Sequence, residues 1–168
     1  MRVLHTLGQK TPPDLRETVF LGPVDDHRAY YAGLPEAATS YAPNLIPDEP
    51  AGLAATLVAL YRAYERLAGD MMHVFAAALR LRDGFFDGTL DRHFSIMSCH
   101  HYPVLEKPPL PGQLRTGAHT DYGAMTILAA TDAQGGLEVR LPEGLEEVRR
   151  DPEQVRVTIA PVEQGRAG

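Results

Sequence analysis

The chain has 168 residues, 44% of them hydrophobic and 23% charged, with a formal net charge of -6. This length suits one domain with a hydrophobic core. No run of Lys or Arg is present, and nucleic acids and anionic membranes are bound through basic patches, so we expect neither partner. The single cysteine, Cys99, cannot form an internal disulfide, and no apolar leader or membrane-spanning stretch is visible, so we expect a cytoplasmic protein.

The first 47 residues are rich in proline and glycine, which predicts loops with short helical pieces. Apolar residues then recur at intervals of three and four, which predicts one face of a long helix that packs in the core. We expect Asp48 and Pro50 to start this helix and Gly84 to end it, over a length of roughly 45 Å. The predicted buried stripe consists of Leu53, Leu57, Leu60, Tyr64, Leu67, Met71, Val74 and Ala78.

Four segments of the second half are rich in strand-forming residues and are separated by turns or loops. They span residues 94–102, 124–131, 137–141 and 155–159. A helical first part followed by short strands predicts an α+β protein, with an antiparallel sandwich or barrel in the second half.

The segment from Arg115 to Gly123 contains the residues with the clearest chemical potential. If the backbone is extended there, His119 and Asp121 project from the same face, about 6 to 7 Å apart along the strand. An imidazole nitrogen and a carboxylate oxygen so placed can bind one metal ion. They would form two-thirds of the 2-His-1-carboxylate triad that holds Fe(II). On spacing alone, a surface histidine beside a turn-forming aspartate is the commoner alternative.

The residues around this pair resemble the metal-binding motif of the isopenicillin N synthase-like branch of the iron(II)- and 2-oxoglutarate-dependent oxygenases. In that motif a His-Thr-Asp-x-Gly is followed by a Thr-containing apolar strand, as in residues 117–128. The likeness covers roughly residues 12–160. It includes residues 13–17, an Asn-x-x-Pro element at 44–47, Phe85-Phe86, His-Tyr-Pro at 101–103 and Gly-Gly-Leu-Glu-Val at 135–139.

The resemblance implies that His119 and Asp121 are iron ligands and that Tyr102 lies beside the carboxylate of 2-oxoglutarate. A buried tyrosine with a satisfied hydroxyl is the alternative for Tyr102. The implied fold is a double-stranded β-helix, or jelly roll, incomplete here. It divides the chain into an N-terminal loop and helical region, 1–92, and the first part of a jelly-roll oxygenase core, 93–168. The implied reaction is the oxidation of a small organic substrate by O2, with Fe(II) and 2-oxoglutarate.

The last part of the chain departs from the family's pattern. No histidine follows His119, so the family's second iron-binding histidine and the Arg-x-Ser pair after it have no counterpart. We therefore expect a C-terminally incomplete member. His100 shares strand parity with Tyr102 and His101 has the opposite parity, and both are interpreted as paired or packing histidines. The alternatives to an enzyme are a truncated, non-catalytic remnant and a binding-only sandwich protein.

Overall fold

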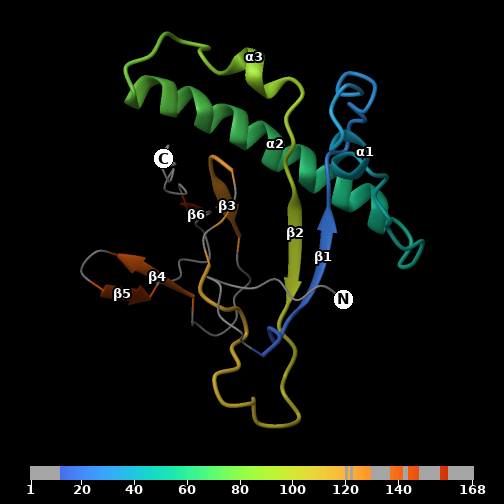
Figure 1. Cartoon of the computed structure of the whole chain (residues 1–168), viewed down its shortest axis with the longest axis vertical. Coiled ribbons are helices and arrows are strands. Elements are labelled where there is room, and N and C mark those ends of the chain that lie inside the picture. Colours follow the sequence, from blue (N-terminus) through green and yellow to red (C-terminus); the bar gives the residue numbers. More distant parts are fainter. Residues whose placement is uncertain are drawn as a thin grey trace. The chain divides into compact units, whose positions relative to one another are not determined.

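The computed structural model describes residues 12–119, 121, 123–129, 137–141, 144–147 and 156–158, with the strand residues from 138 onward described by their backbone. They belong to two compact units, Met1–Ala118 and His119–Gly168. The elements of the first unit are β1 (Glu17–Leu21), α1 (Ala37–Ser40), α2 (Leu53–Ala78), α3 (Asp87–Leu90) and β2 (Met97–His101) (Figure 1). Those of the second are β3 (Thr126–Leu128), β4 (Glu138–Leu141), β5 (Gly144–Glu147) and β6 (Arg156–Thr158).

The α+β class is confirmed by the long helix α2 and by antiparallel strands. Within the described residues the strands form two-stranded ladders, in which β1 pairs with β2, β3 with β6, and β4 with β5. β2, β3, β4 and β6 lie inside the four segments that the sequence predicts as strands. The assignment of the first 47 residues to loops and helical pieces is wrong for β1. Its partner β2 is far away in the sequence, with Glu17 opposite His101, so no local pattern reveals the pairing.

The long helix exists as predicted, but it begins after Gly52 rather than at Asp48 or Pro50. Gly52 has a φ of 85°, a left-handed conformation that a residue inside a helix cannot have. The amide of Thr56 then donates to the carbonyl of Gly52 at 3.0 Å, which starts the helical hydrogen bonding. The helix has 26 residues and a length of about 39 Å, shorter than expected.

Arg80, not Gly84, provides the left-handed residue that ends α2. Its φ is 57°, and its amide donates to the carbonyl of Ala77 at 3.0 Å. The amide of Leu81 donates to the carbonyl of Ala76 at 2.8 Å, which completes a Schellman motif. Gly84 also has a positive φ, 64°, but it lies in the following turn. The predicted end of the helix is therefore wrong by about one turn.

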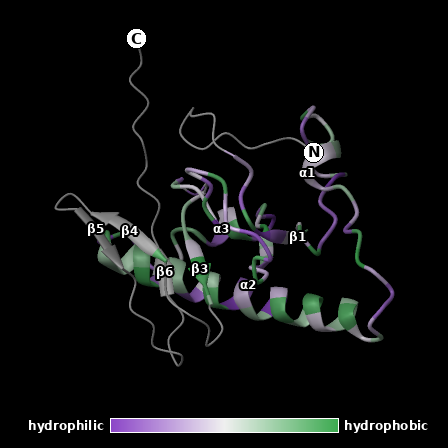
Figure 2. Ribbon diagram, turned by 90° about the horizontal axis from the view of Figure 1, so that it is seen from below, coloured by the Kyte–Doolittle hydropathy of each residue, from purple (hydrophilic) through white to green (hydrophobic). Residues whose placement is uncertain are grey.

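The buried face of α2 contains Tyr61 and Ala76, which are 4% and 2% exposed. Neither belongs to the predicted stripe. Leu60 and Val74 do, yet they are 42% and 56% exposed, so the stripe is wrong at these positions. Tyr61 can be buried without an unsatisfied hydroxyl because this group donates to the carbonyl of Ser95 at 3.1 Å, a contact that a pattern of apolar residues does not reveal. Figure 2 shows how hydrophobic and hydrophilic residues alternate along α2.

No helix in the described part of the chain combines the length and apolar character needed to cross a membrane.

Candidate metal site

The segment that leads to His119 is held by hydrogen bonds to residues near the start of the described chain. The amide of Leu15 donates to the carbonyl of Leu114 at 3.0 Å. The amide of Gly117, which is buried, donates to a carboxylate oxygen of Asp14 at 3.1 Å. These contacts join positions about a hundred residues apart, so they fix the backbone immediately before the predicted metal motif.

The side chains of His119 and Asp121 converge. Nε2 of His119 lies 3.3 Å from Oδ1 of Asp121, and the two side chains are 44% and 40% exposed. Neither residue belongs to a strand, yet the convergence agrees with the expectation that both point to one side. Two donor atoms that occupy neighbouring octahedral positions, each about 2.1 Å from a metal, lie about 3 Å apart. The observed separation and the donor types therefore fit two ligands of one divalent transition metal.

The second oxygen of Asp121 has a partner of its own. Oγ1 of Thr126, the first residue of β3, donates a hydrogen bond to Oδ2 of Asp121 at 2.6 Å. Gly123 lies between them in the sequence, and its φ of 96° is readily adopted only by glycine. Sequence reasoning assigned no role to the hydroxyl of Thr126, although a threonine in the strand after the His-Thr-Asp segment was the available signal.

No group of three or more His, Cys, Asp or Glu side chains able to hold a metal occurs among the described residues. The two neighbouring histidines of β2 have other contacts. Nδ1 of His100 lies 2.9 Å from the hydroxyl of Thr18, and its Nε2 lies 3.1 Å from the hydroxyl of Ser98. Nδ1 of His101 lies 3.0 Å from a carboxylate oxygen of Glu17. The interpretation of both as paired histidines is confirmed.

Tyr102 follows β2 directly and is 45% exposed, so it is not the buried tyrosine of the alternative interpretation. Its hydroxyl and that of Thr116 share a hydrogen bond of 3.1 Å in which either oxygen can donate. Its ring lies 6.3 Å from that of His100, as expected for residues two apart on one face of an extended segment. An exposed phenol with a hydroxyl neighbour is able to donate to a carboxylate ligand.

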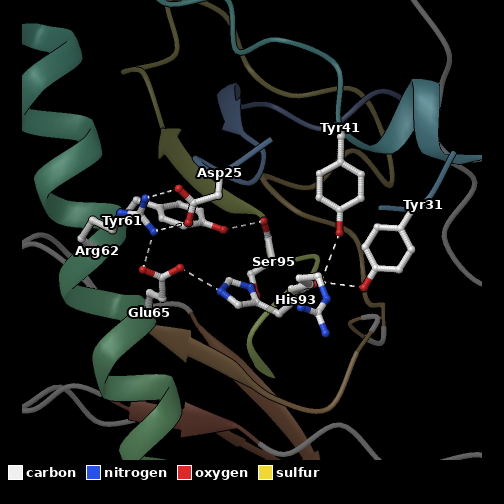
Figure 3. Close-up of polar contacts among 9 residues, drawn as sticks. Asp25, Tyr31, Tyr41, Tyr61, Arg62, Glu65, His93 and Ser95 are labelled. Carbon is white, nitrogen blue, oxygen red and sulfur yellow. Dashed lines mark hydrogen bonds and ion pairs between the residues drawn. The ribbon is translucent and has the colours of Figure 1, made fainter. Parts of the chain in front are cut away.

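A second polar cluster, which we call the Arg62 network, consists of Asp25, Arg62, Glu65 and His93 (Figure 3). Arg62 donates to both carboxylate oxygens of Asp25, at 2.6 and 2.8 Å, and to Glu65 at 2.8 Å. Nε2 of His93 lies 2.9 Å from the other oxygen of Glu65. The network ties α2 to the loop after β1 and to the segment before β2. No local sequence signal predicts it.

Hydrogen bonds from Arg62 hold the pKa of Asp25 below its usual value, against the opposing effect of burial. Burial would raise the pKa of Glu65, but hydrogen bonds from Arg62 and His93 outweigh it and lower this pKa as well. Burial raises the pKa of Tyr61 to about 12. These shifts favour charged carboxylates and a neutral phenol, which suits a structural network rather than an acid–base catalyst near neutral pH.

A pocket of about 170 Å³ lies beside this network, and its polar groups already have partners within the protein. Asp25 is paired with Arg62, and Asp26 accepts hydrogen bonds from Arg28. Asn44, from the predicted Asn-x-x-Pro element, accepts from the amide of Gly22 at 2.8 Å and so anchors its loop to the end of β1. The pocket is lined by Pro23, Val24, Asp25, Asp26, Arg28, Tyr41, Ala42, Pro43 and Asn44.

A mixed helix and strand fold with a converging imidazole and carboxylate is compatible with the class of non-haem metal proteins. No protein-family model matches the chain, but curated relatives do. Over 134 residues the chain is 33% identical to validamycin A dioxygenase from Streptomyces hygroscopicus subsp. limoneus, a match that covers 79% of this chain and 36% of the relative. Over 137 residues it is 30% identical to a 2-oxoglutarate-Fe(II) type oxidoreductase from Emericella nidulans, covering 80% and 39%.

A proline hydroxylase from Petromyces alliaceus is 30% identical over 129 residues, which are 75% of this chain and 36% of that protein. The chain belongs to the 2-oxoglutarate- and Fe(II)-dependent dioxygenase family, as the sequence motifs predicted. The matched segments span 36% to 39% of the length of these three relatives. Membership of the isopenicillin N synthase-like branch stays a prediction.

Proposed function

We propose that this chain carries part of the active site of a non-haem Fe(II)- and 2-oxoglutarate-dependent dioxygenase, with His119 and Asp121 as two iron ligands. The supporting observation is the 3.3 Å separation of Nε2 and Oδ1 in a chain of this family. Both side chains are about half exposed, so a metal ion in solution has access to them. Iron(II), when bound with 2-oxoglutarate and O2, supplies the chemistry that oxidises a small organic substrate.

Tyr102 is proposed to donate a hydrogen bond to a carboxylate of 2-oxoglutarate. Its phenol is half exposed and its oxygen is kept in place by the hydroxyl of Thr116 at 3.1 Å. A hydrogen bond to a charged carboxylate is stronger than one between neutral groups. When 2-oxoglutarate binds, the phenol can therefore donate to its carboxylate in place of the hydroxyl of Thr116. In this proposal the protein orients the co-substrate, and the reacting groups belong to the metal and the small molecules.

We further propose that residues 93–168 form the first part of a jelly-roll core. Residues 1–92 form the loop and helical region that precedes it. This architecture is supported by the antiparallel pairing of every described strand and by the family of the chain. The substrate class is a small organic molecule, as the names of the validamycin A dioxygenase and proline hydroxylase relatives illustrate. We propose a cytoplasmic location, in keeping with the single cysteine, Cys99, which cannot form an internal disulfide.

Metal titration under anaerobic conditions tests the proposal. The chain is titrated with Mn(II), whose free form is measured by electron paramagnetic resonance, and with Fe(II) plus 2-oxoglutarate, for which the absorption band that needs both is recorded. We expect micromolar metal binding that weakens by more than about 100-fold in His119→Ala and Asp121→Ala, since loss of a ligand exceeds the effect of losing a group that only orients one.

Asp70→Ala, at an exposed position of α2, is the matched control and should bind metal like the unmodified chain. Binding that survives in both ligand variants would show that other groups hold the metal. A chain that takes up neither metal would contradict the proposed function directly.

A further inference from the structure

The two carboxylate oxygens of Asp121 have different surroundings. Oδ1 lies 3.3 Å from Nε2 of His119, while Oδ2 accepts the 2.6 Å hydrogen bond from the hydroxyl of Thr126. Oδ1 therefore faces His119, the other proposed metal ligand, and Oδ2 faces the hydroxyl of Thr126.

This arrangement depends on the backbone that follows Asp121. Gly123, which lies between Asp121 and β3, has a positive φ of 96°, and the first residue of β3 contacts the carboxylate through its hydroxyl. β3 is in turn held by β6, with Thr126 opposite Thr158 in the antiparallel register. The hydroxyl of Thr126 is thus presented from a hydrogen-bonded strand, which limits how far it can move away from Asp121.

We propose that Thr126 is a positioning residue that keeps Asp121 as a one-oxygen metal ligand. This inference rests on the proposed function. A carboxylate free to rotate can bind a metal through both oxygens, or turn away from it altogether. The hydrogen bond to Oδ2 restricts both motions and leaves Oδ1 directed toward the side of His119. Groups that orient a ligand in this way typically change metal affinity by about 10- to 100-fold.

The exposure of the site sets the expected size of the effect. Asp121 has a 40% exposed side chain, so water competes with Thr126 for its Oδ2 and replaces part of the lost hydrogen bond. We therefore expect removal of the Thr126 hydroxyl to weaken metal affinity about tenfold, near the lower end of that range.

The test measures Mn(II) affinity of the whole chain, without turnover, from the signal of free Mn(II) in electron paramagnetic resonance. Thr126→Val removes the hydroxyl while keeping the branched shape that suits a strand, and it should weaken binding about tenfold. Thr126→Ser restores a hydroxyl and should bind nearly as tightly as the unmodified chain. Thr126→Ala is a second variant without the hydroxyl and should show the same loss as Thr126→Val.

Thr89→Val is the matched control. Its hydroxyl donates a bond of similar length, 2.7 Å, to the carbonyl of Phe86 in the first unit, so its removal should leave Mn(II) affinity unchanged. Circular dichroism and thermal unfolding verify that each variant is folded. Equal affinity of Thr126→Val, Thr126→Ala and the unmodified chain overturns the inference and leaves the proposed function standing. If Thr126→Ser is as weak as Thr126→Val, the positioning role is likewise refuted. An unmodified chain that binds no Mn(II) overturns both proposals.

Discussion

Glu65 and His93 are 28 residues apart in the sequence, and a carboxylate oxygen of Glu65 lies 2.9 Å from Nε2 of His93. Their side chains are 26% and 23% exposed, so this is a partly sheltered contact rather than a fully solvated ion pair. The other oxygen of Glu65 accepts from Arg62. One carboxylate thereby connects the middle of α2 with the segment that enters β2.

Replacing Glu65 with glutamine should lower the free energy of unfolding by about 1 kcal/mol. The amide of glutamine cannot accept from both Arg62 and His93, so one of these donors loses its partner. Urea unfolding followed by the helical circular dichroism signal measures the change. Glu49→Gln, at an exposed position before α2, is the control and should unfold at the same urea concentration as the unmodified chain. An unchanged midpoint in Glu65→Gln would show that the contact does not stabilise the fold.

The carboxylates of the Arg62 network should make the protein less stable in acid. Asp25 and Glu65 have folded pKa values below their usual 3.8 and 4.5. Their contribution is therefore fully present above the usual values and is lost as the pH falls through the lower folded pKa values. We expect the free energy of unfolding to decrease below about pH 4.5.

Arg62→Met separates this effect from the acid sensitivity of other groups. Without the guanidinium, Asp25 loses the hydrogen bonds that lower its pKa, and Glu65 loses that from Arg62 while it keeps that from His93. The variant should be less stable at neutral pH, and it should lose less additional stability than the unmodified chain between about pH 5 and about pH 3. Parallel slopes for the two proteins over this interval would contradict the assignment of the acid sensitivity to the network.

Glycine at position 80 should stabilise the chain. Arg80 occupies a left-handed conformation at the end of α2, which disfavours any residue with a Cβ. Arg80→Gly should raise the free energy of unfolding by about 0.5 to 1 kcal/mol, after allowance for the greater flexibility of glycine in the unfolded chain. The same substitution inside the helix, Arg66→Gly, should lower it by about 1 kcal/mol. The midpoint temperatures of thermal unfolding should therefore shift in opposite directions in the two variants. A lower midpoint in Arg80→Gly would show that Arg80 is not strained in its left-handed conformation.

The sequence predicts α2 because its apolar periodicity is a local property of a long segment. Its ends depend on single residues that adopt left-handed conformations, and the periodic pattern carries no information on those. The helix begins after Gly52, later than a proline in the first turn would suggest, and it ends at Arg80, about one turn before the expected Gly84. The most buried positions depend on partners such as the carbonyl of Ser95, which lies far along the chain.

The convergence of His119 and Asp121 was predictable because residues two apart in an extended segment project from the same face. The proposed role of Thr126 was not, because it depends on a side-chain contact with Asp121 that residue spacing does not give. The contact of Glu65 with His93 has no sequence signature, since it arises only after α2 and the segment before β2 have come together. Local spacing thus identifies candidate ligands, and tertiary structure decides which residues contact them.

Tyr102→Phe should separate co-substrate binding from metal binding. The phenylalanine ring keeps the shape of the side chain and removes only the hydroxyl that is proposed to contact 2-oxoglutarate. Metal affinity should stay the same, because Tyr102 is not a proposed ligand. The affinity of the Mn(II)-loaded chain for 2-oxoglutarate should fall about tenfold, the value of one hydrogen bond to a charged group.

Two further variants locate the origin of that loss. Thr116→Val removes the neighbour of the Tyr102 hydroxyl and should weaken 2-oxoglutarate binding less than Tyr102→Phe, since the phenol is still able to donate. Tyr64→Phe removes a hydroxyl from α2 and should have no effect. Equal co-substrate affinity in Tyr102→Phe and the unmodified chain would exclude Tyr102 from the co-substrate site while leaving His119 and Asp121 as proposed ligands. A parallel loss of metal affinity would instead mean that Tyr102 supports the metal segment itself, because a group that contacts only the co-substrate cannot change binding in its absence.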